Sequence, residues 1–179
     1  MGGPALRSSR MFIVETFYGD LTIAEAELRA ACAHLEGIGE SWAATTAYAE
    51  LALVLCDQGR FEEAAASAER SRETSAEDDP IGEAGWRASL GRAHAHTGLV
   101  EKAEILAKEA VEIVLATEHL LERADAFRAL ADVLDVAGRS EEAVEAAGLA
   151  LQGYRKKGLT EKAHPVKRLE SMLRSQPNA

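Results

Sequence analysis

The stretch Asp57–Ala68 reads "DQGRFEEAAASA", and close copies of it recur along the chain. "HTGLVEKAEILA" follows at 96–107, "VAGRSEEAVEAA" follows at 136–147, and a weaker copy, "FYGDLTIAEAEL", stands earlier at 17–28. The glycines of the four copies are separated by 40, 39 and 40 residues. A nearly constant period of this length indicates that one structural unit is stacked on itself several times.

Each copy has the composition of a turn between two helices. Apolar residues precede the glycine at helical spacing, as Phe127, Leu130 and Leu134 do, and glycine ends a helix because it tolerates a left-handed backbone. Acidic pairs such as Glu62 and Glu63 follow in the first turn of the next helix, where the helix dipole favours negative charge. An alanine five residues after each glycine lets two helices approach closely. Each unit is therefore predicted to be an antiparallel helix hairpin.

These signals predict an all-α fold, a right-handed superhelical stack of antiparallel helix hairpins. Ser41 and Thr160 fit the N-cap position, and Pro80 fits the first turn of a helix. The eight expected helices cover residues 21–36, 41–58, 61–76, 81–97, 100–117, 120–137, 140–157 and 160–175.

The predicted organisation is a flexible N-terminal segment at 1–10, one repeat domain over 11–175 and a tail at 176–179. Residues 11–18 match only the last half of a first helix, so the chain begins with an incomplete capping unit or is a fragment of a longer polypeptide. The expected units are 11–37 (partial), 41–77, 80–117 and 120–157, followed by a C-terminal capping helix at 159–175.

The pattern of leucine and a small residue, then glycine, then alanine five residues later resembles the tetratricopeptide repeat. The common repeat of that family has 34 residues, so the units here are longer, as in bacterial signalling proteins. More narrowly, Leu120 to Gly158 is similar to the C-terminal repeat region of bacterial adenylate/guanylate cyclase-type and ATPase-type regulators. The resemblance implies an α-solenoid. The sequence carries no cyclase catalytic segment, so that activity is not transferred to it.

Composition and charge exclude several classes of protein. The formal net charge of −10 disfavours nucleic-acid binding, and no stretch has the length and apolar character of a membrane span. Cys32 and Cys56 fall within apolar helical pattern and lack metal-ligand spacing, so we expect buried free thiols. Together with the absence of a secretory signal, these features predict a cytoplasmic protein.

Residue types suited to catalysis are present but are not arranged for it. His94 and His96 are two residues apart, so on a helix they point in different directions and cannot share a metal ion. The glycines do not form a phosphate-binding motif, and adjacent acids such as Glu62 and Glu63 do not face each other. The sequence therefore predicts no enzyme activity, no cofactor and no metal site.

In the related repeats the first helix of each hairpin lines a concave groove. The resemblance then implies a peptide-binding groove formed by Thr46, Ala49, Leu53, Asp57, Ala88, Arg92, His96, Asp125, Arg128, Asp132 and Asp135. Arg92 and Arg128 are the strongest individual candidates, because arginine is frequent at interface hot spots. The alternative is that these residues only cover an exposed face.

Two functions stay open at this point. The first is a non-catalytic scaffold that binds a peptide or helix of another protein in the concave groove. The second is a sensory or regulatory arm of a larger bacterial signalling protein, such as a nucleotide cyclase or transcription regulator. The apolar residues between Met11 and Phe17 add a further expectation, a homo-oligomer formed through the N-terminal half-repeat.

Overall fold

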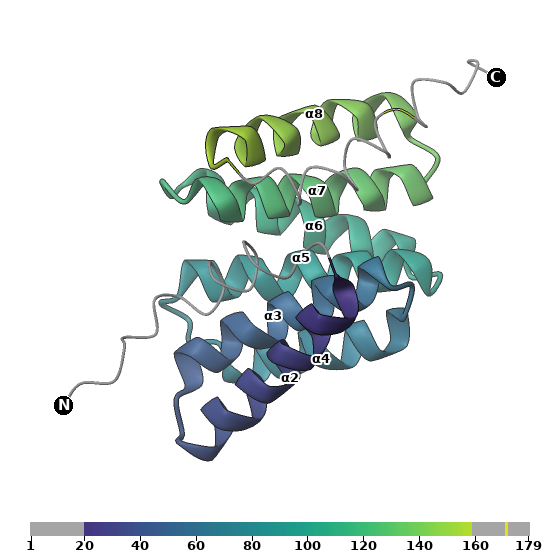
Figure 1. Cartoon of the computed structure of the whole chain (residues 1–179). Helices are drawn as coiled ribbons and strands as arrows, with labels where there is room; N and C mark the ends of the chain where they lie inside the picture. The colour runs from purple at the N-terminus through teal and green to yellow at the C-terminus, as the bar shows by residue number, and fades with distance from the viewer. Residues whose placement is uncertain (1–19, 159–170, 172–179) are drawn as a thin grey trace.

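The computed structural model describes residues 20–158 and the single residue Ser171, and this part contains seven α-helices and no strand (Figure 1). The helices are α2 (Leu21–Gly37), α3 (Ser41–Asp57), α4 (Phe61–Thr74), α5 (Pro80–His96), α6 (Val100–Leu115), α7 (Leu120–Val136) and α8 (Ser140–Lys156). The predicted limits of these seven helices are correct to within two residues. The Thr160 cap, the half-unit at 11–18, both terminal segments and, apart from Ser171, the expected eighth helix at 160–175 lie outside the described residues.

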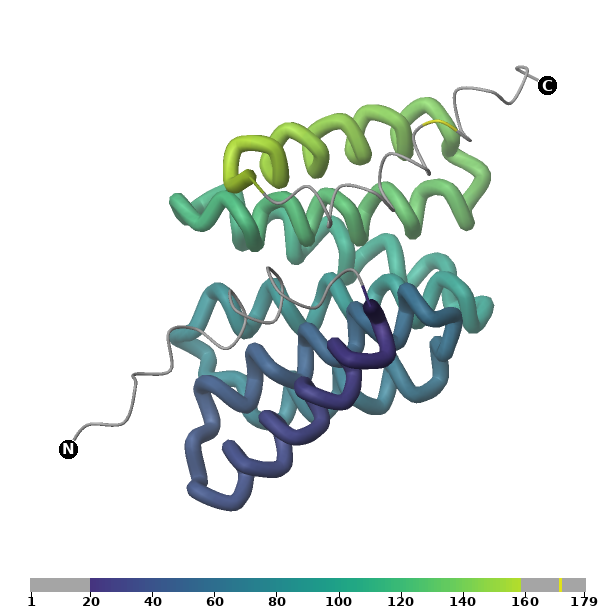
Figure 2. The backbone as a smooth tube through the Cα atoms, in the orientation of Figure 1, coloured from purple at the N-terminus to yellow at the C-terminus, as the bar shows by residue number. Residues whose placement is uncertain are grey.

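The helices form hairpins that follow one another along the stack. The pairs α3–α4, α5–α6 and α7–α8 pack closely, and α2 packs on α3; Figure 2 shows the same succession in the path of the backbone. The first helices of successive units are in contact, since α3 packs on α5 and α5 packs on α7. Each second helix packs on the first helix of the next unit, α4 on α5 and α6 on α7. The stack therefore curves with α3, α5 and α7 on its inner face, and the all-α solenoid is confirmed.

The repeated glycines end the first helices in one common way. Gly59, Gly98 and Gly138 have φ angles of 75°, 85° and 75°. After each of them, a backbone amide donates to a carbonyl five residues earlier at 2.9 Å, in the pairs Arg60–Leu55, Leu99–His94 and Arg139–Leu134. This is the bonding of a glycine-terminated helix, so the predicted role of the glycines is confirmed.

Small residues allow the two helices of a hairpin to approach closely. The alanines five residues after the glycines, among them Ala64, Ala103 and Ala143, are fully buried. Gly91 on α5 faces α6 so closely that an added Cβ would lie 3.2 Å from the carbonyl oxygen of Ala103. The predicted crossing of the helices at these alanines is confirmed.

At the start of α5 the residues have their predicted roles, whereas the N-cap of α3 is one residue earlier than predicted. Asp79 accepts a hydrogen bond from the amide of Ile81 at 3.1 Å, and Pro80 opens α5. Ser41 is not the N-cap residue of α3, because the carbonyl of Glu40 already accepts the amide of Ala44 at 3.2 Å. The helix thus begins at Ser41, and Glu40 precedes it without a side-chain cap.

An arginine after the glycine joins neighbouring second helices on the outer side. Arg60 donates to Glu25 of α2 at 2.6 Å and to Glu63 of its own first turn at 2.7 Å. The equivalent Arg139 binds Glu104 of α6 and Glu142. Glu63 and Glu142 of the repeated turn therefore each bind an arginine. They also lie in the first turn of a helix, where the helix dipole favours negative charge. The middle copy has Leu99 at this position.

Candidate functional site on the inner face

A shallow depression, open to solvent, lies where α3, α5 and α7 meet on the inner face. We call it the inner hollow; its lining residues are Thr46, Ala49, Glu50, Leu53, Ile81, Gly82, Ala84, Gly85, Ala88, Glu122, Asp125 and Ala126. Each of three successive units contributes residues of its first helix, and those of α5 and α7 come from the N-terminal half. A segment lying in the hollow would therefore contact all three units.

Small side chains form the base of the inner hollow. Gly85 lies so close to α3 that an added Cβ would be 3.3 Å from the Cβ of Ala49. Ala84 and Ala88 on the same helix are buried. Because these residues fill little space above the backbone, α3 and α5 approach closely while the surface between them stays recessed.

The charged residues that line the inner hollow are all acids. Glu50 comes from α3, whereas Glu122 and Asp125 come from α7. Glu50 and Asp125 are 3% and 5% exposed, and the side chain of Glu122 is 18% exposed. The hydroxyl of Tyr154 on α8 donates to Asp125 at 2.6 Å, which fixes the position of that carboxylate. The hollow thus has carboxylates on two opposite helices.

The C-terminal halves of the same three helices carry a buried cluster of ion pairs, which we call the inner ion network. Arg92 of α5 donates from Nε to Asp132 of α7 at 2.8 Å and from Nη2 to Asp57 of α3 at 3.0 Å. Arg128 of α7 donates to the same oxygen of Asp57. Nε2 of His96 lies 3.3 Å from the carboxylate of Asp132. The network therefore joins three units through charged side chains.

Burial makes the inner ion network sensitive to any loss of a partner. Arg92 and Arg128 are only 6% and 5% exposed. Burial by itself would raise the pKa of Asp132, but the charge of Arg92 and hydrogen bonds from His96 and Arg92 hold that pKa well below its usual range. Nη1 of Arg92 is buried and has no hydrogen-bond partner within the described part of the chain.

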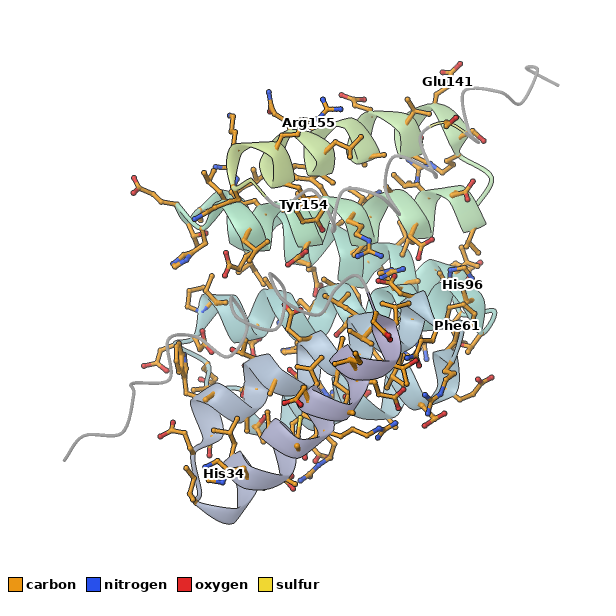
Figure 3. All side chains as sticks on the ribbon, viewed as in Figure 1. His34, Phe61, His96, Glu141, Tyr154 and Arg155 are labelled. Atoms are coloured by element: carbon orange, nitrogen blue, oxygen red, sulfur yellow. The ribbon has the colours of Figure 1, made fainter. Side chains whose placement is uncertain are left out.

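Three neighbouring features complete this end of the inner face. The ring of Phe61 stacks on His96 with centroids 4.1 Å apart and planes at 6°, and Figure 3 labels both side chains at the edge of the stack. Asp135 is half-buried, and burial together with the charge of Asp132 raises its pKa. Burial also raises the pKa of the Cys56 thiol to about 11, so this thiol is protonated and a poor nucleophile near neutral pH.

The structure divides the residues predicted for the groove into two groups. Thr46, Ala49, Leu53, Ala88 and Asp125 line the inner hollow. The others lie in the ion network or beside it: Asp57, Arg92, His96, Arg128, Asp132 and Asp135. The two arginines singled out for partner binding are thus buried in ion pairs within the chain.

Sequence reasoning missed two acids of the hollow. Glu122 precedes Asp125 by three residues, a spacing that places both on one face of a helix, and this signal was available in the sequence. Glu50 follows Ala49 directly and is buried in α3, where only the packing of α3 on α5 reveals its position. The contact of Tyr154 with Asp125 also depends on tertiary structure.

Between residues 20 and 158, no three His, Cys, Asp or Glu side chains gather so as to hold a metal ion. Both cysteines are buried free thiols, as predicted. No helix in the described ranges is long and apolar enough to cross a membrane.

Comparison with known proteins agrees with the fold. Residues 45–77 match the tetratricopeptide repeat family, whose stacked units characteristically form extended concave binding surfaces. No curated protein sequence matches the chain. The family match covers one stretch of the chain, from α3 to the end of α4, and the narrower similarity to cyclase-type and ATPase-type regulators stays a prediction.

Solved structures show the same architecture. The crystal structure of BtubC (BKLC) from P. vanneervenii superposes with a TM-score of 0.54 at 20% identity, covering 90% of this chain and 78% of that one. A putative kinesin light chain of Podosopora anserina with nearly identical TPR-like repeats superposes with a TM-score of 0.57 at 18% identity, covering 98% of both chains. At these identities the likeness defines the fold alone.

Proposed function

We propose that this chain is a non-catalytic interaction scaffold that binds a peptide or helical segment of another protein in the inner hollow. The observation that carries the proposal is the hollow itself, which three successive units line with small and apolar residues on the inner face. Helical-repeat proteins use such concave surfaces for binding. A bound segment would gain contacts from α3, α5 and α7 at once.

The inner ion network supports this function by holding the hollow in shape. Asp57, Arg92 and Asp132 link the three helices that form the hollow. A binding site that is already ordered loses less conformational entropy when its partner binds. In this proposal the buried arginines position the groove, and the residues of the hollow contact the partner.

Peptide selection on the full chain tests the proposal with a matched pair of variants. Thr46 is half-buried and lines the hollow, so Thr46→Trp fills the hollow without entering the core. Ala66 is exposed on α4, and Ala66→Trp adds the same side chain away from the inner face. Peptides selected from a displayed library should bind the Ala66→Trp protein like the unaltered protein and lose binding to the Thr46→Trp protein. Equal binding to both variants would refute the proposal.

A further inference from the structure

We propose that the partner segment leaves the inner hollow over the start of α3, where Trp42 binds one of its apolar side chains and the loops beside Trp42 bind its basic side chains. The occupant is a basic amphipathic helix of another protein. This inference rests on the proposed function and adds a second contact surface and the chemistry of the partner.

Trp42 extends the lining of the inner hollow to the start of α3. It precedes Thr46, which lines the hollow, by four residues, so the two side chains share one face of the helix. Trp42 is 64% exposed, and Ile38, four residues earlier again, is 59% exposed. No large apolar side chain in the described part of the chain is more exposed than Trp42. Because tryptophan is enriched at interface hot spots, this stripe suits an apolar side chain of the partner.

The loops that precede the three first helices lie along one edge of the stack. They cover residues 38–40, 75–79 and 116–119. Each hairpin returns the chain to the edge from which it started, and α5 packs on both α3 and α7, so the three loops follow one another at the left of Figure 1. We call this the loop edge. Ile81 and Glu122 line the hollow from the first turns of α5 and α7, so the hollow opens toward the loop edge.

Every loop of this edge carries exposed negative charge. The acids are Glu40, Glu77, Asp78 and Glu118. Between residues 20 and 158, none of the four forms an ion pair or a side-chain hydrogen bond. They differ in this respect from the buried Asp125 of the hollow, which already accepts a hydrogen bond from Tyr154. The negative charge that a partner can reach therefore lies on the loop edge and not inside the hollow.

This charge favours a basic partner over a second copy of the chain. Two copies that met symmetrically at Trp42 would bring their loop acids together, and like charges at an interface repel. A basic segment gains complementary charge at the same place. A lysine or arginine can also lie over the exposed ring of Trp42 in a cation–π contact. An amphipathic helix supplies both parts, with its apolar face on the stripe of α3 and its basic side chains toward the loops.

Intrinsic fluorescence tests whether a basic helix covers Trp42. The chain has two tryptophans, and Trp86 is only 8% exposed, so Trp86→Phe in the full chain leaves Trp42 as the reporter. The probe is a tryptophan-free amphipathic peptide with leucines on one face and lysines beside them. Its binding should shift the emission of Trp42 to shorter wavelength and protect it from acrylamide. Binding without either change would overturn the inference. Should Trp86→Phe fail to fold, the emission that Trp42→Phe removes from the otherwise unaltered protein gives the same signal.

The charge of the peptide is tested by fluorescence anisotropy with labelled peptides. Two counterparts of the probe carry glutamine or glutamate in place of the lysines. The lysine peptide should bind more tightly than the glutamine peptide by roughly tenfold or more, and the difference should shrink as salt is added. Equal affinity of the lysine and glutamine peptides would overturn the inference.

Two triple variants locate the charge effect at the loop edge. One replaces a glutamate in each loop, and its control replaces an exposed glutamate in the first turn of each second helix, at the opposite edge. The variants are Glu40→Gln/Glu77→Gln/Glu118→Gln and Glu62→Gln/Glu101→Gln/Glu141→Gln. Only the loop variant should lose the preference for lysine. Equal loss in both would indicate general attraction by an acidic protein and would overturn the inference.

A second matched pair tests the apolar contact. Trp42→Ala should weaken binding of the lysine peptide about tenfold, since truncation of a hot-spot residue costs 1 kcal/mol or more. Ile105→Ala removes a side chain that is 59% exposed on α6, away from the loop edge, and should leave the affinity unchanged. The same affinity in Trp42→Ala as in Ile105→Ala would contradict the inference.

The remaining outcomes separate this inference from the function beneath it. If peptides lose binding with Thr46→Trp but bind Trp42→Ala and the loop variant normally, the scaffold function stands and the basic partner at the loop edge is refuted. If no peptide distinguishes Thr46→Trp from Ala66→Trp, both proposals fail. Arg155, Lys156 and Lys157 are exposed at the end of α8. If light scattering finds a dimer that Arg155→Gln/Lys156→Gln/Lys157→Gln and the loop variant each convert to a monomer, the loop edge binds a second copy, and the external partner is refuted.

Discussion

Asp57 is the residue on which the inner ion network converges. Its carboxylate accepts hydrogen bonds from Arg92 in the next unit and from Arg128 in the unit after that. The side chains of all three residues are at most 7% exposed. A buried ion pair need not add net stability over an apolar replacement, but loss of one partner leaves a buried charge behind. The energetic importance of Asp57 therefore lies in the two cations that would remain.

Replacement of Asp57 by asparagine should destabilise the protein strongly. The change keeps the shape of the side chain but removes the charge that faces Arg92 and Arg128, so we expect the free energy of unfolding to fall by about 3 kcal/mol. Urea denaturation followed by circular dichroism measures this. Asp135→Asn is the matched control, and it should leave stability equal or slightly higher at pH 7, because burial and Asp132 disfavour the charge of Asp135. Equal loss of stability in the two variants would contradict this view of the network.

Asp132 should contribute to the acid sensitivity of the fold. Its pKa is lowered in the folded protein, so below about pH 4, the usual range of an aspartate, the unfolded chain binds more protons than the folded one. The free energy of unfolding is therefore highest above that range and decreases as the pH falls through it. In the Asp132→Asn variant, the free energy of unfolding should fall by on the order of 2 kcal/mol less than in the unaltered protein, between pH 5 and the lowest pH at which the protein still folds. Denaturant titrations at several pH values test the effect, and an unchanged pH slope in the variant would contradict it.

At the scale of the helices, the repeated turn combines three physical roles. Gly98, for example, adopts a φ angle of 85° and ends α5, and a fully buried alanine five residues later marks the crossing of the next helix. Where arginine follows the glycine, as at Arg60, it also binds an acid of the preceding second helix. The turn is thus a connection within a hairpin and a contact between hairpins.

The close approach of α5 and α6 at Gly91 leads to a prediction that separates packing from helix propensity. Gly91→Ala would place a methyl group 3.2 Å from a backbone oxygen of α6, and such overpacking costs about 1–3 kcal/mol. Gly148 on α8 has nothing within 4 Å of the added atom, so Gly148→Ala should stabilise the protein by about 0.5–1 kcal/mol. Thermal unfolding of the two variants should shift in opposite directions. A gain of stability in both would show that the helices separate easily at Gly91.

The helices were predictable from the sequence because their signals are local. Gly59 and Pro80 act through their own backbone geometry, and the helical spacing of apolar residues needs no knowledge of the fold. The site was only partly predictable, since Thr46 and Arg92 both lie on the inner side of first helices, yet one lines a hollow and the other is buried in ion pairs. That distinction depends on which charges the neighbouring units bring near, and the repeat pattern does not contain this information.

At the scale of the whole molecule, the inner ion network couples units that would otherwise interact mainly through apolar contacts. Helical-repeat proteins unfold as units joined by nearest-neighbour interfaces. Arg92 of the middle unit binds Asp57 of the unit before it and Asp132 of the unit after it. We therefore expect the units to unfold more cooperatively than they would if only packing contacts between small residues joined them.

Arg92→Met should weaken that coupling while keeping a long side chain at the same place. We expect native-state hydrogen exchange in α7 and α8 to accelerate about tenfold or more relative to α2–α4, because that hairpin can then open independently of the units before it; tenfold corresponds to about 1.4 kcal/mol. Mass spectrometry of peptic fragments gives the comparison. A uniform acceleration along the described helices would instead mean that Arg92 stabilises the protein without coupling its units.

The contact between Asp57 and Arg128 bridges 71 residues of chain, from one unit to the second unit beyond it. In an array held only by neighbouring contacts, an internal unit could be duplicated or deleted and the remaining interfaces would re-form. Here a duplicated middle unit would separate Asp57 from Arg128 and would place two copies of Arg92 in adjacent units. A deletion would remove the cation that Asp132 faces. The number of units between α3 and α7 is therefore fixed by charge balance, so this array could change its length only if its buried charged residues changed with it.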